Sequence, residues 1–199
     1  MIIKICGITR AQDALCAATL GVHALGFVFW PRSPRAISAE RAAAIIETLP
    51  PFLVPVGVFV DPSAGLVAEC RDAGIFVAQI VGAVPAMPRG MRLLPAVTLS
   101  PDGTDITPNV AGNGAVLVDA HDPVRRGGTG RTIDWQAVAP IAARRLVILA
   151  GGLEPGNVGE AIALARPAGV DVSSGVETAP GIKDPERMAA FVAAVRQVA

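Results

Sequence analysis

Short apolar segments that alternate with helical patterns predict an α/β protein, a single (β/α)8 barrel of the TIM-barrel architecture at minimal size. Eight such segments lack a polar face, which is typical of a parallel sheet covered by helices on its faces. The chain has 199 residues, of which 52% are hydrophobic and 17% charged, so it can bury a large core in one domain spanning residues 1–199. The alternative is an open doubly wound sheet, which would need fewer strands or a switch in strand order.

The predicted strands are short, apolar and bounded by glycine, proline or aspartate. They cover residues 1–8, 23–29, 53–60, 77–81, 92–97, 115–119, 146–150 and 170–173. In a parallel barrel all strands end at the same rim, and active residues lie at that rim. We therefore expect the chemistry of this protein in the loops that follow the strands.

The predicted helices show apolar residues at i, i+3, i+4 and i+7, or begin and end at recognisable caps. They cover residues 9–21, 38–49, 61–74, 134–143 and 154–165, with a last helix from residue 185 onward. Thr9 with Gln12 resembles a capping box, Ser38 is a good N-cap, and Asp61 and Asp184 each precede a proline that suits the first helical position.

The alternation is interrupted between residues 83 and 113. Only about nine residues, two of them proline, separate Gly82 from the next strand, whereas a parallel crossover normally needs a dozen or more. The stretch from Thr98 to Gly114 is also poor in helix-forming residues. We expect the fourth helix to be a single turn or missing, and the fifth to be shortened as well.

Charge and cysteine content exclude several functional classes. Lys and Arg number 17 against 17 Asp and Glu, so the molecule has no net field to attract nucleic acid or an anionic membrane. Apolar runs are too short to span a bilayer, and the chain begins with a strand rather than a signal peptide. Three cysteines without a C-x-x-C spacing and two histidines argue against disulfides and a metal site. We expect a cytoplasmic protein, a monomer or a homodimer, with a small-molecule partner.

Two glycine-rich junctions predict a phosphate site. Gly151 and Gly152 follow the seventh strand, and Ser174 and Gly175 follow the eighth, the two positions where barrels of this type commonly bind phosphate. Small residues let backbone N–H groups approach an anion, and a short helix starting after Ser174 would direct its positive end toward it. Turn glycines are common, so each junction alone is a weak signal.

Cys6 ends the first strand, where a thiol is either a catalytic group or inert packing. Catalysis would require a lowered pKa, and Lys4 lies on the same face of the strand by the period of two. A lysine inside a parallel strand needs a partner. We predict Asp171 on the eighth strand, the neighbour that closes the barrel next to the first strand.

Further polar residues follow the second and sixth strands. Asp119 ends the sixth strand and is either a general acid or a loop cap. The next loop contains Gly127-Gly128-Thr129-Gly130, a second backbone cradle for an anion, a mobile lid or a solvent loop. Arg35, in the proline-flanked loop after the second strand, suits a carboxylate or phosphate because its guanidinium binds such groups bidentately; a solvated basic loop is the alternative.

Together these segments resemble the phosphoribosylanthranilate isomerases of tryptophan biosynthesis. The similar motifs run nearly from end to end: Lys4-Ile5-Cys6-Gly7-Ile8-Thr9, Gly26-Phe27-Val28-Phe29 with Ser33-Pro34-Arg35, Val56-Gly57-Val58-Phe59, Gly127-Gly128-Thr129-Gly130 with Asp134-Trp135, Leu149-Ala150-Gly151-Gly152-Leu153 and Val170-Asp171-Val172-Ser173-Ser174-Gly175-Val176-Glu177. Several motifs in the right order are far more specific than any one of them.

The resemblance implies an Amadori rearrangement of N-(5-phosphoribosyl)anthranilate to 1-(2-carboxyphenylamino)-1-deoxyribulose 5-phosphate, without metal or cofactor. It implies that Asp119 is the general acid that opens the ribose ring and that Cys6 is the base that removes the proton from sugar C2. A thiolate of near-neutral pKa suits that step. Arg35 would hold the anthranilate carboxylate, and the backbones of the two glycine-rich junctions would hold the phosphate.

The chain departs from the family pattern after its fourth strand. The family commonly has Gln-Leu-His-Gly there, and this chain has Gln79-Ile80-Val81-Gly82. The polar or basic group often found after the fifth strand is replaced by Ala96-Val97-Thr98. An active isomerase is therefore the main hypothesis, and a repurposed paralogue that binds a sugar phosphate or another anionic metabolite without turnover is the alternative.

Overall fold

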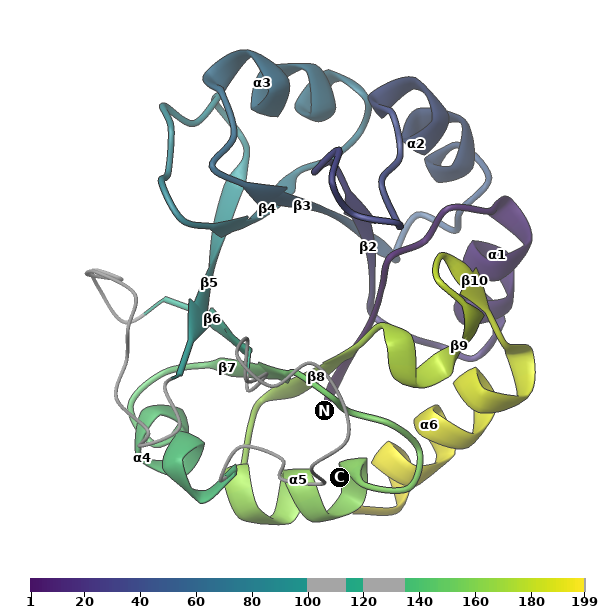
Figure 1. Cartoon of the computed structure of the whole chain (residues 1–199), viewed down its shortest axis with the longest axis vertical. Helices are drawn as coiled ribbons and strands as arrows, with labels where there is room; N and C mark the ends of the chain where they lie inside the picture. The colour runs from purple at the N-terminus through teal and green to yellow at the C-terminus, as the bar shows by residue number, and fades with distance from the viewer. Residues whose placement is uncertain (100–113, 120–134, 199) are drawn as a thin grey trace.

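A closed parallel barrel forms the centre of the computed structural model, which describes residues 1–99, 114–119 and 135–198. Figure 1 shows the barrel end-on, with its strands hydrogen-bonded in sequence order. The strands are β1 (Ile2–Cys6), β2 (Ala24–Val28), β3 (Val54–Val60), β4 (Val77–Val81), β5 (Arg92–Thr98), β6 (Val116–Asp119), β7 (Val147–Ala150) and β8 (Gly169–Val172). The predicted (β/α)8 barrel is confirmed, and the open-sheet alternative is wrong.

Helices surround the barrel, as Figure 1 shows. They are α1 (Ala11–Thr19), α2 (Ala39–Ile46), α3 (Ala64–Asp72), the 3-10 helix η1 (Trp135–Val138), α4 (Ala139–Ala142), α5 (Val158–Ala165), the 3-10 helix η2 (Ser174–Val176) and α6 (Pro185–Val198). A small antiparallel hairpin, β9 (Glu177–Ala179) with β10 (Ile182–Lys183), lies between η2 and α6. The helix predicted to start at residue 134 is, in its described part, a 3-10 turn followed by one short α-helical turn.

Side chains on successive strand positions separate into two layers because they point to opposite faces. One set, including Ile5, Leu25 and Phe27, packs outward against the helices as the main core. The other set points into the barrel, where Leu94, Leu117 and other residues of β5 to β7 form a second apolar cluster. The catalytic candidates belong to this inward set.

Two of the predicted N-caps are wrong. Thr9 does not cap α1, because its hydroxyl donates a hydrogen bond to the carbonyl of Gly181, 2.5 Å away, in the β9–β10 hairpin. The side chain of Asp61 accepts from the backbone N–H of Ala83 at 2.7 Å, so it joins the ends of β3 and β4 while Ser63 caps α3. In both cases a long-range hydrogen bond replaces the local one.

The expectation of a missing fourth helix is confirmed. Residues 82–91 connect β4 to β5 without a helix. The expectation for the fifth helix falls on residues 100–113, outside the described part of the chain. Within the described ranges, no helix combines the length and the apolar composition that crossing a membrane requires.

Candidate active site

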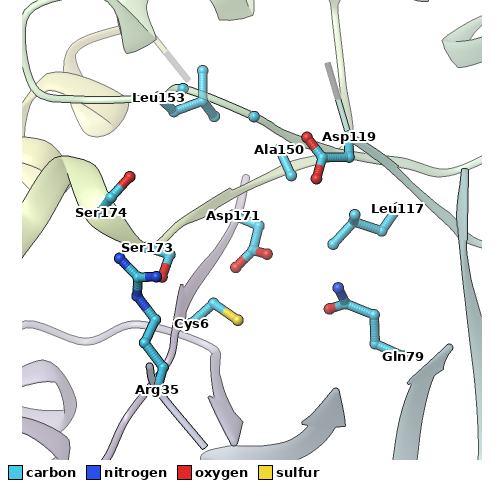
Figure 2. A pocket seen from close by; sticks show the side chains of 12 residues that line it. Cys6, Arg35, Gln79, Leu117, Asp119, Ala150, Leu153, Asp171, Ser173 and Ser174 are labelled. Carbon is cyan, nitrogen blue, oxygen red and sulfur yellow. The ribbon is translucent and has the colours of Figure 1, made fainter. Parts of the chain in front are cut away.

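A cavity of about 330 Å3 opens at the carboxyl ends of the strands. Its described lining consists of Cys6, Arg35, Gln79, Leu117, Asp119, Ala150, Gly151, Gly152, Leu153, Asp171, Ser173 and Ser174. Figure 2 shows the thiol and the two carboxylates of this set directed into the same space. Strands far apart in the sequence thus bring most of the predicted site residues together.

Cys6 lies at the end of β1 and faces the cavity, with only 8% of its surface exposed. Its register partner on β2 is Gly26. A Cβ atom at position 26 would lie 2.7 Å from Sγ of Cys6 and 3.1 Å from Nζ of Lys4. Glycine at this position therefore makes room for both the thiol and the ammonium group.

Burial raises the pKa of the Cys6 thiol, and the nearby ammonium of Lys4 offsets this only in part. The expectation of a near-neutral thiolate is thus wrong for the free protein, because removing the site from water disfavours the charged form. In this state the thiol keeps its proton. Additional positive charge in the cavity would favour ionisation.

Lys4 and Asp171 form the predicted ion pair across β1 and β8. They are direct register partners, and Nζ of Lys4 donates to Oδ1 and Oδ2 of Asp171 at 2.9 and 3.0 Å. Both side chains are almost fully buried. Burial by itself lowers the pKa of Lys4, but the carboxylate of Asp171 outweighs it and raises that pKa above its ordinary value. The pair as a whole is neutral, and it holds the ammonium group of Lys4 in a fixed position beside Cys6.

Asp119 is the last residue of β6 and lines the cavity from the opposite wall. Its register partners are Thr98 on β5 and Ala150 on β7. Figure 2 shows its carboxylate across the open space from the sulfur of Cys6. A proton donor on one wall and a base on the opposite wall can act on two different atoms of one small molecule.

Arg35 lines the cavity but is not a free basic residue in a solvated loop. Its Nε and Nη2 donate to the carboxylate of Glu177, with Nε–Oε1 and Nη2–Oε2 distances of 2.9 and 2.5 Å. Glu177 also accepts from Nζ of Lys183 at 2.7 Å. Burial by itself raises the pKa of Glu177, but the two cations outweigh it and hold that pKa below its usual range. This bidentate pair fixes the orientation of the guanidinium.

The same buried network reaches the loop after β8. Nζ of Lys183 donates to the carbonyl oxygen of Ser173 at 3.2 Å, and the side chain of Lys183 is fully buried. Sequence reasoning assigned no role to Glu177 or Lys183, because their contacts depend on the β9–β10 hairpin folding back under the loop. The only sequence signal for Lys183 is its place after Gly181 and Ile182, directly before the helix cap Asp184.

The phosphate candidates divide into lining and supporting residues. Gly151, Gly152 and Ser174 line the cavity, and both glycines have positive φ, 94° and 64°, which disfavours other residues. Gly175 is not among the described lining residues. A Cβ on Gly175 would lie 2.0 Å from the carbonyl oxygen of Leu153, so this glycine permits close contact between the two loops.

Asn157 was missed as a support of the same loop. Its Nδ2 donates to the carbonyl of Gly152 at 2.9 Å, and its Oδ1 accepts from the backbone N–H of Glu154 at 2.8 Å. The short helix predicted after Ser174 is the three-residue η2. That turn is too short for a substantial dipole, so any anion held there depends on individual N–H groups.

Three further residues bear on the predicted site. Gly128 lies outside the described residues. Val81, at the place of the family histidine, packs against the apolar cluster inside the barrel and is not among the described lining residues of the cavity. Gln79, two positions earlier, does line it, and sequence reasoning assigned it no role.

An acid and a thiol on opposite walls of one cavity, with an arginine and glycine-rich loops at the rim, place the chain among the (β/α)8-barrel enzymes. Comparison with known proteins then identifies the family. The model of N-(5'-phosphoribosyl)anthranilate (PRA) isomerase matches residues 3–194. The chain belongs to this family, the isomerases of tryptophan biosynthesis.

Individual relatives support this assignment, and the similarity covers nearly the whole length of each chain. The N-(5'-phosphoribosyl)anthranilate isomerase of Chlorobaculum tepidum is 44% identical over 210 residues, with 98% of this chain and 95% of the relative covered. A phosphoribosyl anthranilate isomerase solved in complex with reduced 1-(o-carboxyphenylamino)-1-deoxyribulose 5-phosphate has a TM-score of 0.80 at 32% identity, with 99% and 100% of the two chains covered. Monomers generated from the dimeric Thermotoga maritima enzyme have a TM-score of 0.78 at 31% identity, with 98% and 99% covered.

Proposed function

We propose that this chain converts N-(5-phosphoribosyl)anthranilate to 1-(2-carboxyphenylamino)-1-deoxyribulose 5-phosphate by acid–base catalysis, with Asp119 as the acid and Cys6 as the base. The observation that carries the proposal is the placement of these two groups on opposite walls of one cavity, in a chain of this family. Residues 1–199 act as one domain. No cofactor enters the scheme.

Cys6 first loses its thiol proton to solvent, so that the reacting form holds a proton on Asp119 and none on Cys6. Asp119 donates its proton to the ribose ring oxygen, the C1–O bond breaks, and the nitrogen lone pair forms a C1=N iminium. The thiolate of Cys6 then removes the proton from C2, and the C–H electrons form a C1=C2 bond while the nitrogen becomes neutral. Transfer of the C2 hydroxyl proton to C1 yields the ketone.

The raised pKa of Cys6 fits this sequence of steps. Burial keeps the thiol protonated in the free protein, but the iminium adds a positive charge next to the sulfur. Opposite charge favours the ionised thiol, and the Lys4 ammonium contributes in the same direction. The thiolate would therefore be stabilised at the stage when C2 has become acidic.

Substrate binding would use the rim. The Nη1 group of Arg35, which donates no hydrogen bond to the described residues, is available for the anthranilate carboxylate. Gly151, Gly152 and Ser174 would bind the phosphate through backbone N–H groups, with Gly175 keeping the two loops in contact and Gly128 contributing from its own loop. We place the protein in the cytoplasm, and light scattering of the purified chain distinguishes a monomer from a homodimer.

A fluorescence assay tests the function. Purified protein should consume phosphoribosylanthranilate with loss of the anthranilate signal, and Cys6→Ala and Asp119→Ala should each lower kcat by roughly 100-fold or more, the usual contribution of a general acid or base. Cys16→Ala, on α1 and away from the cavity, is the matched control. Tight phosphate binding without turnover by the unaltered protein would instead support the repurposed paralogue.

A further inference from the structure

Gln79 has an unsatisfied buried amide at the wall of the cavity. It is the middle residue of β4, and 6% of its surface is exposed. Its Oε1 is buried and accepts no hydrogen bond from the described residues. Nearly all buried polar side-chain atoms have a partner, so one that lacks it at a ligand cavity calls for a ligand group.

The described part of the barrel wall offers no partner for the amide oxygen of Gln79. Gln79 is in register with Val58 on β3 and Leu94 on β5, both apolar. Val77 and Val81, on the same face of β4, pack against the interior apolar cluster. A hydrogen bond to the carboxamide must therefore come from the cavity. Because the terminal torsion of glutamine is broad and roughly two-fold, either Oε1 or Nε2 can face a bound molecule.

The position of Gln79 in the cavity determines which part of a bound substrate it would contact. Figure 2 shows its carboxamide directed toward the space between the sulfur of Cys6 and the carboxylate of Asp119. The glycine-rich loops after β7 and β8 and the guanidinium of Arg35 lie at the rim, around the other side of the cavity. A substrate with its phosphate at these loops and C2 beside the sulfur would therefore place C1, C2 and the nitrogen on C1 opposite Gln79.

We propose that Gln79 is a further catalytic residue, whose amide oxygen accepts a hydrogen bond from the substrate nitrogen and stabilises the iminium. This inference rests on the assignment of Cys6 and Asp119 above. The N–H remains on nitrogen throughout ring opening, and no proton passes to Gln79. The hydrogen bond strengthens as the nitrogen becomes cationic, because bonds from an ionised donor are about twice as strong as neutral ones.

A neutral acceptor suits this place better than a carboxylate. Asp171 already places one negative charge in the cavity, and a second one near Cys6 would disfavour the thiolate. The carboxamide also provides selectivity, because a sugar phosphate with oxygen in place of the C1 nitrogen has no N–H to donate. Such a substrate would leave the buried amide oxygen unpaired, and this would lower kcat/KM for it.

Replacing Gln79 by methionine tests the proposal, since methionine keeps the length of the side chain and removes the acceptor. We expect Gln79→Met to lower kcat by roughly 10- to 100-fold, the value of a hydrogen bond to a charged group. The KM and the Kd for the reduced product analogue, which has an N–H but forms no iminium, should change by less than about threefold. Gln79→Glu, which retains an acceptor oxygen but adds a negative charge near Cys6, should shift the pH profile of kcat to higher pH.

Controls separate this role from a structural one. Gln12→Met, at an exposed position of α1 outside the described cavity lining, should leave kcat unchanged. Thermal unfolding should show Gln79→Met at least as stable as the parent, because the variant removes an unpaired buried oxygen. An unchanged kcat, or equal losses in kcat and in analogue binding, would overturn the proposal. Absence of turnover in the parent protein would instead refute the proposed function.

Discussion

The two halves of the barrel interior are built differently. Strands β5 to β7 fill their half with Leu94, Ala96, Leu117, Ile148 and Ala150, which pack as one apolar cluster. Strands β8, β1 and β2 fill the other half with a buried ion pair, a thiol and a glycine, namely Lys4 with Asp171, Cys6 and Gly26. The first half contributes hydrophobic stabilisation, whereas the second holds charges at defined positions beside the reacting group at a cost in desolvation.

Breaking the ion pair should produce the largest difference between the halves. Lys4→Met leaves the carboxylate of Asp171 buried without a partner, and we expect a loss of about 3–5 kcal/mol in the free energy of unfolding. Catalysis should fall as well, because the positive charge beside Cys6 is removed. Denaturant unfolding and the fluorescence assay measure both effects.

The double variant Lys4→Met with Asp171→Leu sharpens that comparison. It removes both charges and should recover most of the lost stability, because apolar residues often replace a buried pair at little cost. Catalysis should not recover. A single variant that loses less than about 1 kcal/mol would contradict the view that the pair is fully desolvated.

A residue of the apolar half that does not line the cavity should affect stability alone. Leu94→Ala creates a cavity within the interior cluster and should cost about 2–4 kcal/mol in the free energy of unfolding. Leu94 is not among the described lining residues of the active-site cavity, so kcat should remain near that of the parent at temperatures where the variant is folded. A large loss of kcat with little loss of stability would show that the two halves are not separable in this way.

The smallest effect is expected from filling the space beside Cys6, in the half of the barrel that contains the ion pair. Gly26→Ala places a methyl group 2.7 Å from Sγ of Cys6, and overpacking of this kind costs about 1–3 kcal/mol. Movement of the sulfur should lower kcat more than it raises KM. The matched control is Gly65→Ala in α3, where the new Cβ meets only Ser63 Oγ at 3.9 Å and should stabilise the helix by about 0.5–1 kcal/mol.

Features set by local pattern were predictable from the sequence. The eight strands, the missing helix between β4 and β5 and the caps at Ser38 and Asp184 follow from apolar periodicity and from residues within a few positions of each other. The Lys4–Asp171 pair was also predictable, because barrel closure brings the first and last strands together and a buried lysine requires a counter-charge.

Features set by long-range contacts were decided only by the tertiary structure. The carboxylate that holds Arg35 lies 142 positions further along the chain, and Thr9 bonds to Gly181 rather than to its own helix. Gly175 supports two loops instead of lining the cavity, and Gln79 becomes a candidate catalytic group only because its neighbours on β3 and β5 are apolar. Sequence periodicity identifies which residues face the barrel interior, but which polar groups meet there depends on closing the sheet, where each side chain exchanges water for partners from other strands.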